Sequence, residues 1–115
     1  MVEFKRVESS LIVRLKGEID DCAAKVLRGK IDVEYDLTGA RDMVLDFSRV
    51  SFMDSTGIGM IIGRYKRVCA LGGCVKVFGA NNNVKRIIEL SGLGRIVKIY
   101  DSEKAALGKV GRTND

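Results

Sequence analysis

Short apolar runs alternate along this chain with longer segments in which apolar residues recur every three or four positions. The short runs are typical of strands and the longer segments of amphipathic helices, so the predicted element order is β-β-α-β-α-β-α-β-α. Strands that alternate with helices form right-handed β-α-β crossovers and a largely parallel sheet. The sequence therefore predicts an α/β fold with a mixed, mostly parallel five-stranded sheet and about four helices.

Turn residues set the bounds of the predicted strands. The first two are expected to form a hairpin at the sheet edge, around Glu8 and its two following serines. A loop is expected between the third strand and Asp54. The predicted strands span residues 4–7, 11–15, 43–47, 74–78 and 96–100.

Capping side chains mark where the helices begin. The first helix follows Asp20 and ends before Gly39. The second begins at Ser55 and is ended by two glycines at 72 and 73. Asn81, Asn82 and Asn83 offer caps for the third, and Asp101 with Ser102 is expected to cap a short last helix that runs through about residue 107.

The second helix has the clearest pattern in the chain. Its apolar positions, which include Ile58 and Cys69, repeat at helical spacing. Arg64, Lys66 and Arg67 are expected on the opposite, solvated side. All three cysteines are expected to be small buried residues, since they form no C-x-x-C pair.

Length and composition limit the class of protein. A chain of 115 residues has room for one domain, residues 1–115, and 46% hydrophobic with 30% charged residues is typical of a soluble globular protein. The apolar runs are shorter than the roughly 18 residues of a membrane span, and the first residues show no signal-peptide pattern. We therefore expect a cytoplasmic protein that neither crosses a membrane nor binds to one.

The sequence contains no histidine, which removes the commonest general base and every Ser-His-Asp triad. The cysteine spacing does not resemble a zinc or iron-sulfur site. We expect no enzyme, no metal and no cofactor. The net charge of +5 leaves a basic nucleic-acid-associated protein as an alternative, although no nucleic-acid module is present and a solvated basic helix face is favoured.

Residues 51–59, SFMDSTGIG, combine two hydroxyls, one carboxylate and two glycines at a helix start. Asp54 or Ser55 could cap the helix while the glycines allow close packing. A nucleotide-binding loop is disfavoured, because both G-x-G-x-x-G and G-x-x-x-x-G-K-[ST] fail. Alternatively, Ser55 could accept a phosphate, which a helix N-terminus stabilises by about 0.3 to 1 kcal/mol.

Two stretches, FMDSTGIGMIIGRYKR and GGCVKVFGANNNVKRIIELSGLGRI, together with the earlier VRLKGEID, make the chain similar to a known family. It resembles anti-sigma factor antagonists with a STAS domain, of the stage II sporulation protein AA type. The resemblance covers nearly the whole chain.

The resemblance implies a switch without enzymatic activity. The unphosphorylated protein would bind an anti-sigma factor serine kinase and release its sigma factor, of the sporulation sigma F type. The kinase would phosphorylate Ser55 and so switch the antagonist off, and a serine phosphatase would reverse the modification. Antagonists of a general stress sigma pathway belong to the same family and are the alternative.

The resemblance also implies a partner-binding surface, with Asp54 presenting the serine and the glycines giving the partner access. Thr56 stands where the sporulation branch commonly has serine, and residues 21–23 stand where well-known members carry histidines. The residues implied in partner binding are Asp20, Met53, Asp54, Ser55, Thr56, Gly57, Ile58 and Gly59.

Overall fold

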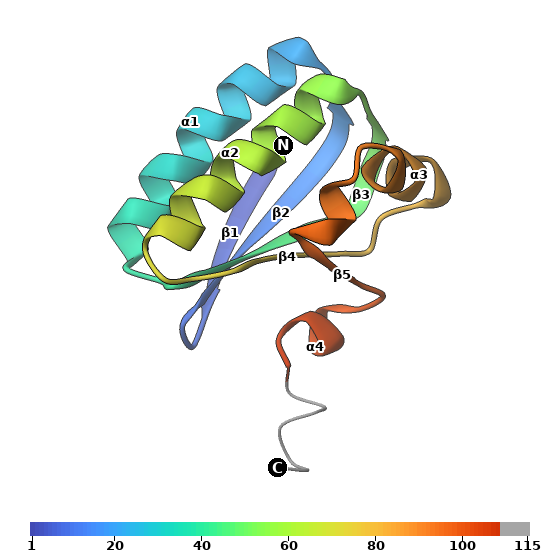
Figure 1. Ribbon diagram of the computed structural model, residues 1–115. Helices are drawn as coiled ribbons and strands as arrows, with labels where there is room; N and C mark the ends of the chain where they lie inside the picture. Colours follow the sequence, from blue (N-terminus) through green and yellow to red (C-terminus); the bar gives the residue numbers. More distant parts are fainter. Residues whose placement is uncertain (109–115) are drawn as a thin grey trace.

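The computed structural model describes residues 1–108, so residues 109–115 of the predicted domain lie outside it. The described chain forms one five-stranded sheet in the order β1-β2-β3-β4-β5 (Figure 1). β1 pairs with β2 antiparallel, and the other three pairings are parallel. The strands are β1 (Val2–Val7), β2 (Ser10–Ile19), β3 (Asp42–Met53), β4 (Val75–Phe78) and β5 (Lys98–Tyr100). This confirms the predicted α/β fold and the edge hairpin.

Four α-helices connect or follow the strands, with a short 3₁₀ helix, η1 (Leu93–Arg95), before β5. None of the helices within residues 1–108 is both long and apolar enough to cross a bilayer. The α-helices are α1 (Asp21–Thr38), α2 (Ser55–Ala70), α3 (Asn82–Leu90) and α4 (Glu103–Ala106).

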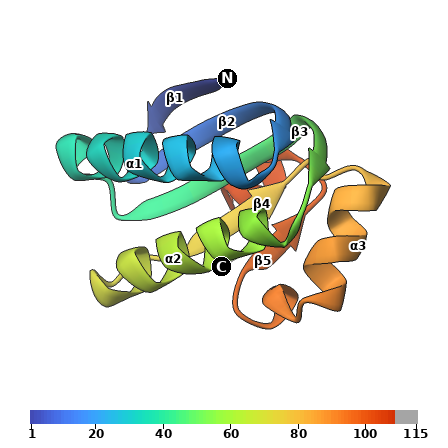
Figure 2. The ribbon, with the colours of Figure 1, turned by 90° about the horizontal axis from the view of Figure 1, so that it is seen from above.

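The three longer helices lie on one face of the sheet, and the short α4 lies on the other. α1 and α2 run side by side over one face, and α3 lies beyond them near β3 (Figure 2). The main core lies between these helices and the sheet, and includes Leu27, Phe47, Ile61 and Ile88. On the other face, α4 inserts Ala106 into a smaller cluster.

β3 is longer than predicted. The expected loop between residue 47 and Asp54 is wrong, because the strand continues to Met53 and stays paired with β2 up to Ile19. Exposed polar residues at 48, 49 and 51 interrupt the apolar run, so the pattern conceals the strand. The extension carries the helix start to the very edge of the sheet.

Two side-chain predictions are also wrong. Cys22, Cys69 and Cys74 are exposed, because the first two lie on outer surfaces of α1 and α2 and the third directly precedes β4. Arg64 is 9% exposed instead of solvated, and its Nε lies 2.8 Å from an Asp32 carboxylate oxygen of α1. An acidic partner on the neighbouring helix is what brings this charge into the helix interface.

Candidate functional site

The helices α1 and α2 begin next to each other, at the carboxyl ends of two neighbouring parallel strands (Figure 1). Ile19, the last residue of β2, is the register partner of Met53, the last residue of β3. The Asp54 N–H donates to the Ile19 carbonyl oxygen at 3.3 Å, which ties the two helix starts together. The edge where parallel strands end is where α/β proteins place their binding sites.

An aspartate caps each of these helices. Asp20 Oδ1 accepts a hydrogen bond of 2.9 Å from the Ala23 N–H, and Asp54 Oδ1 accepts one of the same length from the Thr56 N–H. The Thr56 hydroxyl also donates to Asp54 Oδ1. This hydroxyl holds the pKa of the Asp54 carboxyl below its usual value, so the cap is a carboxylate at neutral pH.

The two neighbouring hydroxyls at this helix start differ in availability. Ser55 is the first residue of α2 and is exposed, and within residues 1–108 its hydroxyl has no hydrogen-bond partner. Thr56 is half-buried, and its hydroxyl is engaged by Asp54. Only the serine therefore presents a free nucleophilic oxygen to a partner.

The two glycines of the stretch have different roles. A Cβ on Gly57 would lie 2.2 Å from Cγ of Met53 and 3.3 Å from Cγ2 of Ile19, so the close packing of α2 on the sheet requires glycine there. Gly59 is exposed, and no atom lies within 4 Å of a Cβ built on it. The expectation of close packing is therefore confirmed for Gly57, whereas Gly59 leaves open surface.

The structure separates the eight implied contact residues into surface and support. Met53 and Ile58 are 4% and 7% exposed, and they pack in the main core beneath the helix start. Gly57 is also buried. The surface itself is formed by the exposed Asp20, Ser55 and Gly59, with Asp54 and Thr56 half-buried between them.

Two further residues belong to this end of the sheet and were not predicted from the sequence. Phe52 is 48% exposed, and it pairs in register with Glu18. Asn81 Nδ2 donates to the Val50 carbonyl oxygen at 3.1 Å, which brings the start of α3 to the same edge. Strand alternation was the available signal for Phe52, since a strand that buries Met53 turns its neighbour outward.

The polar groups of this site are hydroxyls and carboxylates. No histidine is present in the sequence to activate the serine. Within residues 1–108, no group of three cysteine, aspartate or glutamate side chains is placed to hold a metal ion.

Comparison with known proteins identifies the family. The family model for the STAS domain matches residues 1–106. An anti-sigma F factor antagonist from Paenibacillus polymyxa is 38% identical over 92% of this chain and 91% of its own length. An anti-sigma-B factor antagonist from Bacillus subtilis is 37% identical over 85% of this chain and 88% of its own length.

Solved structures agree with these relatives. The unphosphorylated form of the anti-sigma factor antagonist SpoIIAA superposes with a TM-score of 0.80 and 29% identity, over 96% of each chain. The phosphorylated form of the Bacillus cell fate determinant SpoIIAA gives a TM-score of 0.73 and 26% identity, over 96% of this chain and 99% of the other. The predicted resemblance is thus confirmed, and the chain belongs to the STAS domain family, in its anti-sigma factor antagonist branch.

Proposed function

We propose that this anti-sigma factor antagonist binds an anti-sigma factor serine kinase through the start of α2, and that phosphorylation of Ser55 switches the binding off. The observation that carries the proposal is the contrast between two adjacent hydroxyls. Ser55 is exposed and without a partner in the described chain, while Thr56 is bonded to Asp54. A relative is known in phosphorylated and unphosphorylated forms.

The unphosphorylated surface would bind the kinase and displace its sigma factor. Asp20, Ser55 and Gly59 would form the contact, and Phe52 would add an exposed aromatic at its rim. Gly59 has no side chain, so the partner can approach the helix backbone closely. The buried Met53, Gly57 and Ile58 would keep this surface in place.

A phosphate on Ser55 would block this contact without unfolding the protein. In the free protein, the positive end of α2 stabilises a phosphate by about 0.3 to 1 kcal/mol, which opposes the repulsion from Asp54. In an interface, a dianion placed against carboxylates costs several kcal/mol, and each 1.4 kcal/mol weakens binding tenfold. Because Ser55 is exposed, a serine phosphatase could reach it and restore binding.

We place the controlled sigma factor in the sporulation sigma F type, on the strength of the Paenibacillus relative. The alternative is a general stress sigma pathway, for which the Bacillus relative is the model. Both pathways act on transcription, so we place the protein in the cytoplasm. Capture by one of the two corresponding kinases in preference to the other distinguishes the pathways.

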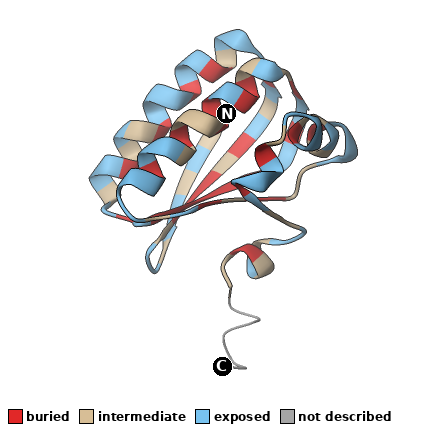
Figure 3. Ribbon diagram, in the orientation of Figure 1, coloured by how far each residue is buried: buried red, intermediate tan, exposed pale blue. Residues whose placement is uncertain are grey.

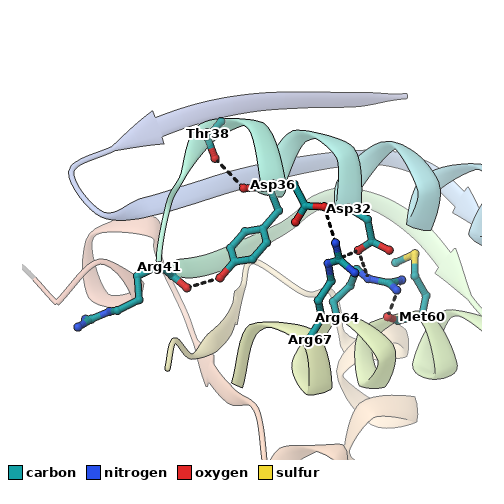
Figure 4. A network of polar contacts seen from close by, with 8 residues as sticks. Asp32, Asp36, Thr38, Arg41, Met60, Arg64 and Arg67 are labelled. Carbon is teal, nitrogen blue, oxygen red and sulfur yellow. Dashed lines mark hydrogen bonds and ion pairs between the residues drawn. The ribbon is translucent and has the colours of Figure 1, made fainter. Parts of the chain in front are cut away.

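A nucleic-acid-associated function has less support. Two of the three basic side chains expected to face solvent on α2 are engaged, since Arg64 pairs with Asp32 and Arg67 with Asp36 (Figure 4), whereas Lys66 is exposed. Phosphate contacts need free cations on one surface. The start of α2, where the available hydroxyl lies, is capped by an aspartate, Asp54.

The test is phosphopeptide mass analysis after incubation with ATP and each candidate kinase. We expect one phosphate, on Ser55, that is absent from Ser55→Ala. Thr56→Ser is the matched control, because serine keeps a hydroxyl that can donate to Asp54, and it should leave the phosphate on residue 55. A phosphate on residue 56 of the wild type would contradict the proposal.

Binding supplies the second half of this test. Ser55→Ala should bind the kinase as tightly as the wild type and should stay bound in the presence of ATP. Ser55→Asp should bind roughly a hundredfold more weakly, since about 3 kcal/mol of like-charge repulsion corresponds to two factors of ten. Equal affinities for the two variants in a titration would contradict phosphorylation as the switch.

A further inference from the structure

The face of the sheet that carries α4 is only partly covered. α4 packs against β4 and β5, and its Ala106 shares a small apolar cluster with Ile12 and Val44. Figure 3 shows exposed and half-buried segments along the strands beside the buried ones. Within residues 1–108, the carboxyl ends of β2 and β3 and the neighbouring β1 have no helix packed on them on this face.

This uncovered part of the sheet holds a hollow of about 400 Å³, within the range of roughly 300 to 1,000 Å³ that is typical of small-molecule sites. Ile12 lies in the cluster with α4, so strand alternation places Arg14 and Lys16 on the same face. Arg49 directly precedes Val50, which packs in the main core, and it therefore turns to this face as well. The side chains that line the hollow include Glu3, Arg14, Lys16, Asp46, Ser48 and Arg49.

Some of the charges in this hollow are already neutralised by one another. Arg14 Nη1 lies 2.9 Å from a carboxylate oxygen of Asp46 and 2.9 Å from one of Glu103. Asp46 also accepts hydrogen bonds from the N–H and the hydroxyl of Ser48. These groups satisfy one another, so they form the wall of the hollow and leave other residues to bind a ligand.

Lys16 and Arg49 are two cations in the hollow without a partner. Both are exposed, and neither side chain makes an ion pair or a hydrogen bond within residues 1–108. They are register partners on β2 and β3, and neighbouring strands lie about 4.8 Å apart. Like charges placed opposite each other on a sheet repel. An anion bound between the two side chains would replace this repulsion with attraction.

Glu3 is a third unpaired charge, and it lies on the other side of the hollow. It is exposed, pairs in register with Arg14 and makes no ion pair in the described part of the chain. Because β2 separates β1 from β3, the backbones of Glu3 and Arg49 are about 10 Å apart. A carboxylate repels an anion but accepts a hydrogen bond from a hydroxyl. The hollow therefore offers cations at one end and a hydroxyl acceptor at the other.

We propose that this hollow binds a small phosphate ester that carries hydroxyl groups, of the sugar phosphate class. Lys16 and Arg49 hold the phosphate, and Glu3 accepts a hydrogen bond from a hydroxyl at the other end of the molecule. Arginine can donate two parallel hydrogen bonds to a phosphate, and lysine adds a point charge. This site lies on the face of the sheet opposite α1 and α2. The proposal goes beyond the proposed function and does not rest on the role of Ser55.

Titration of the full chain with glucose 6-phosphate tests the site, with backbone amide shifts read from two-dimensional NMR spectra at constant ionic strength. At about pH 7.5 the phosphate ester is a dianion. The amides of Lys16 and Arg49 should shift together, with a dissociation constant on the order of 1 mM. Arg49→Gln should raise this constant at least about tenfold, because it removes the bidentate donor.

Arg86→Gln is the matched control. Arg86 is exposed on α3 and has no ion-pair partner within residues 1–108, so this variant loses the same charge away from the hollow. It should change the dissociation constant by less than about twofold, because salt screens distant exposed charges. Thermal melts of both variants establish that they fold. Equal losses of affinity in Arg49→Gln and Arg86→Gln would overturn the proposal.

Two simpler probes separate the parts of the ligand. Inorganic phosphate should bind at least about threefold more weakly than the ester, which is the contribution of one hydrogen bond, and glucose should cause no shift at these amides. Glu3→Ala should abolish this preference for the ester. The proposal would be overturned by a preference that persists in Glu3→Ala, by phosphate binding as tight as that of the ester, or by no saturable shift of Lys16 and Arg49 up to about 20 mM ester.

Discussion

Gly57 and Gly59 are two residues apart on α2, and their different surroundings allow packing and partner contact to be tested separately. Gly57→Ala places a Cβ against the buried Met53, which should lower the free energy of unfolding by about 1 to 2 kcal/mol. Gly59→Ala meets no atom and should raise it by about 0.5 to 1 kcal/mol. Urea denaturation measures both changes, and a loss of stability in Gly59→Ala would contradict the open surface. A stable Gly59→Ala variant that binds the kinase more weakly would place Gly59 in the contact.

Residues whose roles are local could be predicted from the sequence, and residues whose roles depend on distant partners could not. The helix caps Asp20, Asn81 and Ser102 lie among the residues predicted to cap these helices, because a cap bonds to a backbone N–H only three residues away. The burial of Arg64 depends instead on Asp32, which lies 32 positions earlier and on another helix. The expectation that all cysteines are buried failed because residue type alone carries no information on which side of an element a residue lies.

At the scale of elements, three ion pairs join α1 to α2, in which Asp32 meets both Arg64 and Arg67 and Asp36 meets Arg67 (Figure 4). Burial lowers the pKa of the Arg64 guanidinium, and the nearby cations Arg28 and Arg67 act in the same direction, whereas Asp32 raises it. Arg64 also donates to the Met60 carbonyl oxygen at 3.3 Å. The pair of Arg64 and Asp32 therefore fixes how the helices pack rather than adding much stability.

The two partners of this pair should respond unequally to substitution. Asp32→Ala leaves Arg64, whose side chain is 10% exposed, as a buried charge, so the free energy of unfolding should fall by about 3 kcal/mol. Arg64→Met removes that charge and leaves Asp32, which is 26% exposed and still near Arg67, so the loss should be about 1 kcal/mol or less. Chemical denaturation of both variants measures the difference. Equal losses would mean that the pair acts as a surface ion pair.

The bounds of the elements show the same limit of sequence reasoning. The start of α2 was predicted because its cap and its apolar repeat are local signals. The second half of β3 was missed because its exposed polar residues resemble a loop, and only pairing with β2 reveals it as a strand. That half of the strand carries Phe52 and Met53. Because the strand was missed, the exposed position of Phe52 beside the predicted Met53 was missed as well.

At the scale of the whole molecule, the titratable groups predict a wide plateau of stability. The sequence has no histidine, so no side chain has its ordinary pKa between about 5 and 8. Two carboxylates lie in the sheet, and Asp42 and Asp46 are 7% and 6% exposed. Burial alone would raise both pKa values. Arg41 and a hydrogen bond from the Cys74 N–H lower the pKa of Asp42 below its usual range. Hydrogen bonds from Ser48 and the ion pair with Arg14 lower the pKa of Asp46 in the same way.

A carboxyl group whose pKa is lower in the folded state than in the unfolded state stabilises the fold at pH values above its unfolded-state pKa. This contribution disappears as the pH falls through its folded-state pKa. At the alkaline end, burial raises the pKa of Tyr35, so its contribution is present below about pH 10 and is lost as the pH rises through the folded value. The free energy of unfolding should therefore be flat from about pH 5 to 8 and should fall below about pH 4.

Urea denaturation midpoints between about pH 2.5 and 9 measure this profile, and Asp46→Asn identifies one of the groups responsible. The variant loses a charge-assisted bond to Arg14, and we expect it to be less stable at neutral pH by about 1 to 3 kcal/mol. Its stability should also fall less steeply in acid, because one of the carboxyls that takes up a proton on unfolding is absent. A steady decline of the wild type between pH 8 and 5, or an acid slope unchanged in Asp46→Asn, would show that groups other than these buried carboxylates control the stability.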